Sequence, residues 1–388
     1  MHPQTSTSGQ QAGQDEYLFL SGHRSLRASG IFRRLNTPAG DGGFDSHVAA
    51  AFGAARAAGI AQPVLMGAIP FDLDQPSQLF IPHEARFFDR AERLAAAMAG
   101  KAARGEVVRA SSMPDEQGFK AAVRQAIANF QHSEIKKAVL SRICELRFAQ
   151  PVAVDAIFDA LCRQNPHGYQ FRLPMLDGSS LIGVSPELLL RKSGKQILTF
   201  PLAGSAKRQA DAAQDEAVGA DLLASAKDHY EHSLVIDEIR RVLAPHCQAL
   251  DVPAAPNLLS TSAMWHLGTR IDGELADGAS SSLGLACQLH PTPAVCGYPT
   301  ALSRKLINLI EPFERGVFSG MVGWCDEHGD GEWVVTIRCA TIQQETVRLF
   351  AGAGIVEASS PEAEWAETQA KLGTMLGAFG LTAAEALA

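Results

Sequence analysis

The chain has 388 residues, of which 46% are hydrophobic, and a formal net charge of −8. An acidic chain does not suit broad binding to nucleic acid or to an anionic membrane surface, so an anionic ligand would need local positive charge. No run of about 18 apolar residues is present, and residues 1–16 lack the basic and apolar regions of a signal peptide. We therefore expect a cytoplasmic protein without a membrane segment, and a disordered polar tail over residues 1–16.

The cysteines support a reducing compartment. All seven are expected to be free, because their number is odd, no CxxC pair is present and most lie in apolar stretches.

The first half of the chain mixes helical and strand-like patterns. Alanine-rich segments with spaced apolar residues predict amphipathic helices at about 45–59 and 85–99. Residues 101–116 contain Gly, Ser and Pro and indicate a joint before a helix at about 117–131. An apolar, β-branched run predicts a strand at 137–148, and the next helix is expected at about 153–164.

Short strands dominate the second half. We expect strands at 169–176, 181–184, 188–192, 196–200, near 257–268, and at 318–325, 332–343 and 346–351. Two helices are expected at about 210–226 and 227–242, and a last helix from Pro361 to about Ala378. Helices and hairpins alternate without βαβ spacing. The sequence therefore predicts a single α+β domain over 17–388, with antiparallel sheets covered by helices.

Several charged residues are candidates for acid–base chemistry. Lys137 begins an apolar strand, where a lysine either reaches the sheet edge or forms a desolvated amine that can act as a base. Lys136 has the opposite strand parity, so one of the two should face solvent. Glu187 precedes an apolar run, and burial would make it a candidate general acid. For Lys137 and Glu187 an edge charge on a sheet remains the alternative. Arg338, inside an apolar strand, indicates a fixed anion.

Carboxylates on two predicted helices are candidate metal ligands. Glu364 and Glu367 are three residues apart, and Lys371 follows Glu367 by four, so all three lie on one face. Mg²⁺ needs one or two protein carboxylates, so Glu231 with one distant glutamate would suffice. The same spacing fits a solvated face with an ion pair. The histidines beside Glu231 could instead contribute to a zinc site.

Common catalytic motifs are absent, because the chain has no HExxH, P-loop, GxSxG or EF-hand sequence. Gly352 and Gly354 follow a predicted strand but lack the third glycine of a dinucleotide fingerprint. They could let backbone N–H groups approach a carboxylate ligand, or could form only a tight turn.

Ordered sequence blocks over about 125–380 resemble the chorismate-utilising enzymes, and in particular the isochorismate synthases of siderophore and menaquinone pathways. The blocks are KAVLSR (137–142), SPELLLRK (185–192), FPLAGSAKR (200–208), SAKDHYEHSLVIDEI (225–239), TSAMWHL (261–267), CQLHPTPAVCGYP (287–299), EPFERGVFSGMVGW (311–324), GEWVVTIRCATI (331–342) and LFAGAGIVEASSPEAEWAETQAKL (349–372). The resemblance implies two packed antiparallel β-sheets with helices on the outer faces.

The resemblance also implies roles for individual residues. Lys137 would activate water for attack at C2 of chorismate, and Glu187 would protonate the departing C4 hydroxyl. Glu231 and Glu367, with Glu364 nearby, would bind Mg²⁺. The implied substrate-binding positions are Gly204, Ser205, His266, Ala294, Phe318, Arg338, Gly352, Gly354 and Lys371.

Two blocks distinguish activities within the family. PLAGS at 201–205 and TPAVCGYP at 292–299 replace the PIKGT and GSVTGAPK blocks of glutamine-dependent members, which favours water over ammonia as the nucleophile. We therefore expect a monomeric, Mg²⁺-dependent isochorismate synthase that acts reversibly, with siderophore biosynthesis as its pathway. A salicylate synthase, which also eliminates pyruvate, and a non-catalytic chorismate-binding paralogue remain the alternatives.

Overall fold

The computed structural model describes residues 16–100, 105–278, 280–382 and 385–386. The expected disordered tail lies outside these residues, except that Glu16 begins the first strand. The helices of the described residues are α1 (Phe44–Ala57), α2 (Arg90–Met98), α3 (Glu116–Phe130), α4 (Val154–Gln164), α5 (Ala212–Ala224), α6 (Ala226–Leu243), the 3₁₀ turn η1 (Ala244–His246), α7 (Ser282–Leu289), α8 (Thr300–Ile310) and α9 (Pro361–Ala378).

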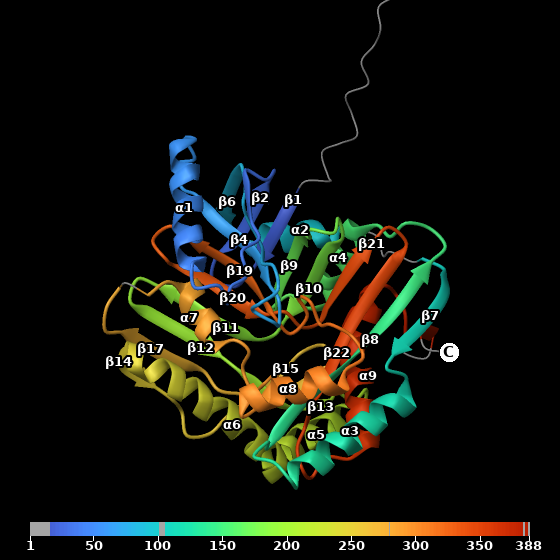
Figure 1. Ribbon diagram of the computed structural model, residues 1–388. Helices are drawn as coiled ribbons and strands as arrows, with labels where there is room; N and C mark the ends of the chain where they lie inside the picture. The colour runs from blue at the N-terminus through green and yellow to red at the C-terminus, as the bar shows by residue number, and fades with distance from the viewer. Residues whose placement is uncertain (1–15, 101–104, 279, 383–384, 387–388) are drawn as a thin grey trace, which may run out of the picture.

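Two large antiparallel sheets form the centre of the molecule (Figure 1). We call them sheet A and sheet B. Sheet A has the order β18-β8-β22-β21-β10-β9-β1-β2-β6, with β7 also paired to β8, and its strands are β1 (Glu16–Leu20), β2 (Ser25–Ser29), β6 (Glu84–Phe88), β7 (Val107–Met113), β8 (Lys137–Phe148), β9 (Tyr169–Pro174), β10 (Ser180–Ser185), β18 (Gly297–Tyr298), β21 (Cys339–Gln343) and β22 (Thr346–Ile355).

Sheet B has the order β14-β17-β12-β11-β20-β19-β4-β5-β3. Its strands are β3 (Arg33–Leu35), β4 (Val64–Ile69), β5 (Gln78–Ile81), β11 (Leu188–Ser193), β12 (Gln196–Phe200), β14 (Cys247–Asp251), β17 (Ile271–Leu275), β19 (Met321–Asp326) and β20 (Gly331–Val335). A third, small sheet has the order β13-β16-β15, from β13 (Leu202–Lys207), β15 (Asn257–Ser260) and β16 (Met264–Gly268).

The apolar core lies in three layers. Phe19, Phe171 and Leu181 of sheet A pack with Phe80, Trp324 and Val334 of sheet B in one buried cluster between the sheets. Helices α4 and α9 pack on the other face of sheet A, and α1, α6 and α7 pack against sheet B, as Figure 1 also shows. The α+β fold with two antiparallel sheets and outer helices is therefore confirmed.

The alternation of side chains along β8 orients the site. Cys144, Leu146 and Phe148 pack against the outer helices, whereas Ile143 packs between the sheets. Because strand side chains alternate, the other odd-numbered residues of β8 also face inward, and these include Lys137. Strand β22 pairs with β8 over ten residue pairs, from Ala138–Ile355 to Arg147–Thr346.

Several sequence-based boundaries were wrong in the first third of the chain. The expected helix over 85–99 is strand β6 followed by α2, which begins after Asp89, whose side chain accepts a hydrogen bond from the Ala91 N–H. The expected joint over 101–116 contains strand β7, whose partly exposed residues pair with β8. A partly exposed edge strand needs no apolar alternation, so its pattern resembles a loop.

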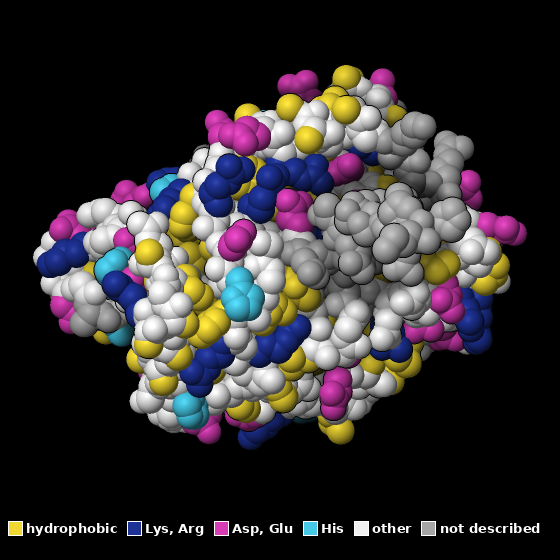
Figure 2. All heavy atoms as spheres, turned by 90° about the horizontal axis from the view of Figure 1, so that it is seen from above, with side chains coloured by type: hydrophobic (Ala, Val, Ile, Leu, Met, Phe, Trp, Pro, Cys, Tyr) yellow, Lys and Arg dark blue, Asp and Glu magenta, His cyan; other side chains and the backbone are white. Residues whose placement is uncertain are grey.

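The surface carries charged side chains of both signs, in agreement with the composition of the chain. On the face that Figure 2 shows, acidic and basic side chains are interspersed with neutral and apolar ones. No helix in the described part of the chain combines the length and apolar character needed to cross a bilayer.

Candidate active site

The site lies where the chain crosses twice between the large sheets. Glu187 lies on the crossing from β10 in sheet A to β11 in sheet B, and Arg338 on the crossing from β20 in sheet B to β21 in sheet A. The Val335 N–H donates to the Glu187 carbonyl at 3.1 Å, and the Val184 N–H donates to the Arg338 carbonyl at 3.0 Å. These bonds hold the crossings to neighbouring strands.

Arg338 therefore lies between two strands and not inside one, which corrects the prediction of a single strand over 332–343. Its φ of 50° breaks the extended backbone there. Ser319, on the adjoining loop, has a φ of 59° and also lines the cavity described next. Backbone strain of this kind is typical of functional sites.

One cavity brings most of the predicted site residues together. It is lined by Glu187, Gly204, Ser205, Glu231, His266, Ala294, Phe318, Arg338, Gly352, Gly354, Glu367 and Lys371. Lys137 and Glu364 do not line it, but Lys137 pairs with the lining residue Glu231, and Glu364 lies three residues before the lining residue Glu367 on α9. Apolar parts of the wall, among them Val139, Val295, Ile337 and Phe350, were not predicted from the sequence. Their apolar character gave no signal that separated them from ordinary core residues.

Lys137 is fully buried, whereas its neighbour Lys136 is exposed. The Lys137 Nζ forms an ion pair with Glu231 Oε1 at 2.8 Å. Strand parity therefore separates the two lysines as expected, and Lys137 is the one that faces the site. Gly354 makes the pair possible, because a Cβ at that position would lie 2.2 Å from Glu231 Oε1 and 3.0 Å from Lys137 Cε.

Burial changes the acid–base properties of the cavity walls. It raises the pKa of Glu187 to about 7, so this carboxyl is substantially protonated at neutral pH. Burial also lowers the pKa of His266 well below its ordinary value, which keeps the imidazole neutral. Burial lowers the pKa of Arg338 to about 10, and the guanidinium stays charged at neutral pH. The cavity thus holds an acid, a neutral imidazole and a fixed cation.

Each candidate metal-binding glutamate is paired with a lysine. Besides the pair of Lys137 with Glu231, Lys371 Nζ lies 2.6 Å from Glu367 Oε1, and Lys227 Nζ lies 3.2 Å from Glu364 Oε1. The expected ion pair on α9 is present, but its face lines a cavity and is not a solvated surface. Lys227 precedes Glu231 by four residues on α6, a spacing that could have indicated it in the sequence.

The glutamates of α9 differ in their acidity. Burial, together with the nearby Glu367 carboxylate, raises the pKa of Glu364 to about 7. Burial acts in the same direction on Glu367, but the Lys371 ammonium outweighs it and lowers the Glu367 pKa. Ser205 Oγ also donates to Glu367 Oε1 at 3.1 Å. Glu367 is therefore the more strongly ionised of the two.

These carboxylates suit magnesium better than zinc. Among the described residues, no three His, Cys, Asp or Glu groups stand close enough to form a ligand cluster. Glu231 on α6 and Glu367 on α9 nevertheless line the same cavity, and one or two carboxylates suffice for Mg²⁺ when water and substrate supply the other oxygens. The side chains present thus fit a magnesium ion completed by a ligand.

The histidines beside Glu231 serve the fold. The ring nitrogens of His232 lie 3.1 Å from the Ala203 carbonyl and 2.7 Å from Thr269 Oγ1. His229 Nε2 lies 2.8 Å from the Leu223 carbonyl. Both rings are thus engaged within the fold, and the geometry gives the zinc alternative no support.

The two glycines lie inside a strand, which corrects the expectation that they follow one. Strand β22 continues to Ile355, so Gly352 and Gly354 pair with Ser141 and Val139 of β8. Lys371 Nζ donates to the Gly352 carbonyl at 2.9 Å, which holds α9 against this strand. Because Gly352 and Gly354 carry no side chains, this part of the inward face of β22 leaves space for the cavity.

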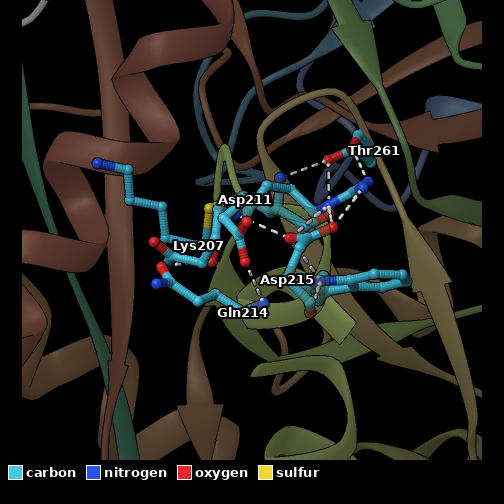
Figure 3. A network of polar contacts seen from close by, with 9 residues as sticks. Lys207, Asp211, Gln214, Asp215 and Thr261 are labelled. Carbon is cyan, nitrogen blue, oxygen red and sulfur yellow. Dashed lines mark hydrogen bonds and ion pairs between the residues drawn. The ribbon is translucent and has the colours of Figure 1, made fainter. Parts of the chain in front are cut away.

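A polar network fixes the small sheet that carries Ser205 and His266 (Figure 3). The Asp215 carboxylate accepts hydrogen bonds from Arg208 Nε at 2.7 and 3.0 Å, from the Gln209 N–H at 2.8 Å and from Trp265 Nε1 at 3.1 Å. The bond from Arg208 is the main cause that lowers the Asp215 pKa to about 2. Asp215 therefore ties α5 to the ends of β13 and β16.

Comparisons with known proteins agree with this geometry. Residues 73–380 match the family described as chorismate binding enzyme. Isochorismate synthase EntC of Escherichia coli K12 is 44% identical over 373 residues, 95% of each chain. Isochorismate synthase DhbC of Bacillus subtilis 168 is 41% identical over 379 residues, 94% of each chain. The crystal structure of DhbC from Bacillus anthracis matches with a TM-score of 0.88 at 39% identity, covering 95% of this chain and 97% of that chain.

The similarity is thus longer than the segment of about 125–380 expected from the sequence blocks. Both the extent of the match and the identity over nearly the full length establish the relationship. This chain belongs to the family of chorismate-binding enzymes.

Proposed function

We propose that this chain is an isochorismate synthase, which isomerises chorismate to isochorismate, and that it serves siderophore biosynthesis. The relatives that match along nearly its whole length carry this activity in their names. One structural observation carries the residue assignments: the buried Lys137 amine pairs with Glu231, and Glu231 lines the same cavity as the Glu187 carboxyl, Arg338 and Glu367.

The reaction needs a base and an acid. Lys137 in its amine form removes a proton from a water molecule that attacks C2 of the ring, which requires that the ammonium paired with Glu231 first releases its own proton. Glu187 donates its proton to the C4 hydroxyl, which leaves as water while the ring double bonds shift. One water is consumed and one is released, so the reaction is a net isomerisation and is reversible. The Glu187 pKa of about 7 suits this role, because a useful fraction of the carboxyl is protonated at neutral pH.

The substrate carries two carboxylates, and the cavity contains groups that can bind them. Arg338 and Lys371 line the wall and supply positive charge. We assign Glu231 and Glu367, with Glu364 beside them, as the residues that would hold Mg²⁺. A bound Mg²⁺ would supply charge neutralisation and orientation for the ring carboxylate. The apolar wall at Ala294 and Phe318 would enclose the ring.

A product assay tests the proposal. Purified protein is incubated with chorismate and Mg²⁺, and the mixture is separated by chromatography while pyruvate is measured with a coupled dehydrogenase. We expect isochorismate to form, and the final ratio of isochorismate to chorismate to be the same whether the reaction starts from chorismate or from isochorismate. Stoichiometric release of pyruvate would show a salicylate synthase, and binding without turnover would show a non-catalytic paralogue.

A further inference from the structure

A buried ion pair outside the proposed machinery binds two adjoining parts of the cavity wall. Arg315 and Glu311 lie between α8 and β19, and their side chains are 2% and 3% exposed. Arg315 Nε and Nη2 donate to the two carboxylate oxygens of Glu311 at 2.8 and 2.5 Å. Arg315 Nη1 donates to the Val295 carbonyl at 2.8 Å, and Nη2 donates to the Val139 carbonyl at 2.7 Å.

These two carbonyls belong to residues that line the cavity. Val139 lies two residues beyond Lys137 on β8, and Val295 lies on the loop after α7. Glu311 adds a third connection, because its Oε1 accepts the Ser141 N–H at 2.7 Å. The loop also lies directly beside β8, because the Val139 N–H donates to the Cys296 carbonyl at 2.9 Å. The arginine and the glutamate therefore reinforce the contact between the strand of the proposed base and this neighbouring loop.

A purely stabilising role would not require these residue types. A buried ion pair loses much of its attraction to desolvation, and apolar residues of similar volume often replace such a pair without loss of stability. Apolar side chains cannot hold two carbonyls at a set distance. A planar guanidinium can, because its N–H groups point in fixed directions.

We propose that Arg315 and Glu311 are positioning residues that fix how the loop at Val295 lies against β8 at Val139, and so shape the part of the cavity wall that places the ring of chorismate relative to Lys137. The inference rests on the proposed function and deepens it. Neither residue lies among the proposed metal-binding glutamates, so the requirement for Mg²⁺ should not depend on this pair.

Arg315→Lys tests the proposal, because lysine keeps the charge but has one nitrogen in place of the guanidinium fork. Arg191→Lys is the matched control. Arg191 pairs with Glu332 in sheet B at 2.8 and 2.5 Å, and neither residue lines the cavity in the described part of the chain. Initial rates with chorismate, the half-maximal Mg²⁺ concentration and guanidinium unfolding are measured for wild type and both variants.

For Arg315→Lys we expect kcat/KM to fall by roughly tenfold or more, with a higher KM for chorismate and an unchanged half-maximal Mg²⁺ concentration. Arg191→Lys should stay within about twofold of wild type in both constants. A merely structural role would reduce the amount of folded enzyme but leave KM unchanged. Equal kinetic effects in the two lysine variants, or a wild-type KM in Arg315→Lys, would overturn the inference.

Glu311→Gln covers the case in which Arg315→Lys does not fold. The glutamine oxygen can still accept the Ser141 N–H, but its NH₂ group would face a donor nitrogen of Arg315, so the fork must turn. We expect a raised KM for chorismate here too, and a wild-type KM would refute the proposal. Wild-type protein that fails to convert chorismate would instead reject the proposed function, so the two failures are distinguishable.

Discussion

Gly354→Ala places one methyl group against the proposed catalytic pair. The added Cβ would lie 2.2 Å from Glu231 Oε1, whereas Cβ atoms essentially never approach other heavy atoms within 3.0 Å. The carboxylate must therefore move by at least 0.8 Å, and the Lys137 amine that it holds moves with it. A displacement of about 1 Å costs roughly 100-fold in rate, equivalent to about 2.7 kcal/mol of transition-state stabilisation.

The fold should tolerate this change, because the nearest atoms belong to the ends of side chains and the backbone at Gly354 does not have a positive φ. We expect the free energy of unfolding to change by no more than about 1 kcal/mol, which corresponds to no more than roughly 4 °C in Tm. Gly373→Ala in α9 is the control, since nothing lies within 4 Å of the added Cβ there. Steady-state kinetics and thermal unfolding separate the two effects. A Gly354→Ala enzyme with kcat/KM within twofold of wild type would refute this account of the site.

Four further results are expected from the same geometry. Lys137→Ala should lower kcat by at least roughly 1,000-fold with the fold intact, whereas Lys136→Ala should be nearly neutral, and the reverse pattern in stopped assays would assign the base to Lys136. Because Glu187 must carry a proton and has a pKa of about 7, the profile of kcat/KM against pH should bend near pH 7, and a profile without a bend there would exclude Glu187 as the acid. EDTA should stop turnover. Glu231→Ala should raise the half-maximal Mg²⁺ concentration by roughly tenfold or more, and an unchanged Mg²⁺ dependence of the activity would exclude Glu231 as a metal ligand. Asp215→Asn should lower Tm at pH 7. Because the Asp215 pKa is depressed to about 2, the difference in Tm from wild type should shrink as the pH falls from about 4 toward 2. A difference in Tm that stays constant over this range would show that the Asp215 charge is not involved.

Elements with a strong local signal were predicted well from the sequence. The strand over 137–148, the strand over 196–200 and the helix over 361–378 have the predicted bounds. Each has a local cause: a long apolar run, a flanking turn or a proline in the first helical turn. Strand β7 was not predicted, because its stability comes from pairing with β8. This partner lies about 35 residues away in the chain, and no local sequence pattern reveals it.

In the candidate site, too, local patterns predicted some features and missed those that depend on contacts between distant parts of the chain. Strand parity indicated that one of Lys136 and Lys137 is buried, and the family resemblance favoured Lys137. Only the fold shows that the partner of Lys137 is Glu231, 94 residues later. Helical spacing placed Glu364 and Glu367 on one face but could not tell a solvated face from a cavity wall. Arg338 was taken for a strand residue, because the apolar residues on both sides of it belong to two strands of different sheets.

The charges of the cavity suggest why each glutamate is paired with a lysine. Three carboxylates gathered in a buried space would repel one another, and the ammonium groups of Lys137, Lys227 and Lys371 offset that repulsion within ion pairs. Chorismate brings two negative charges and magnesium two positive ones, so binding both adds no net charge to this space. The lysines can then exchange carboxylate partners, and no buried charge is left unpaired. The free-energy cost of an unpaired buried charge is far larger than the stabilisation that any single ion pair provides. On this account the lysines are as much a part of the proposed metal site as the glutamates, although they would bind no metal.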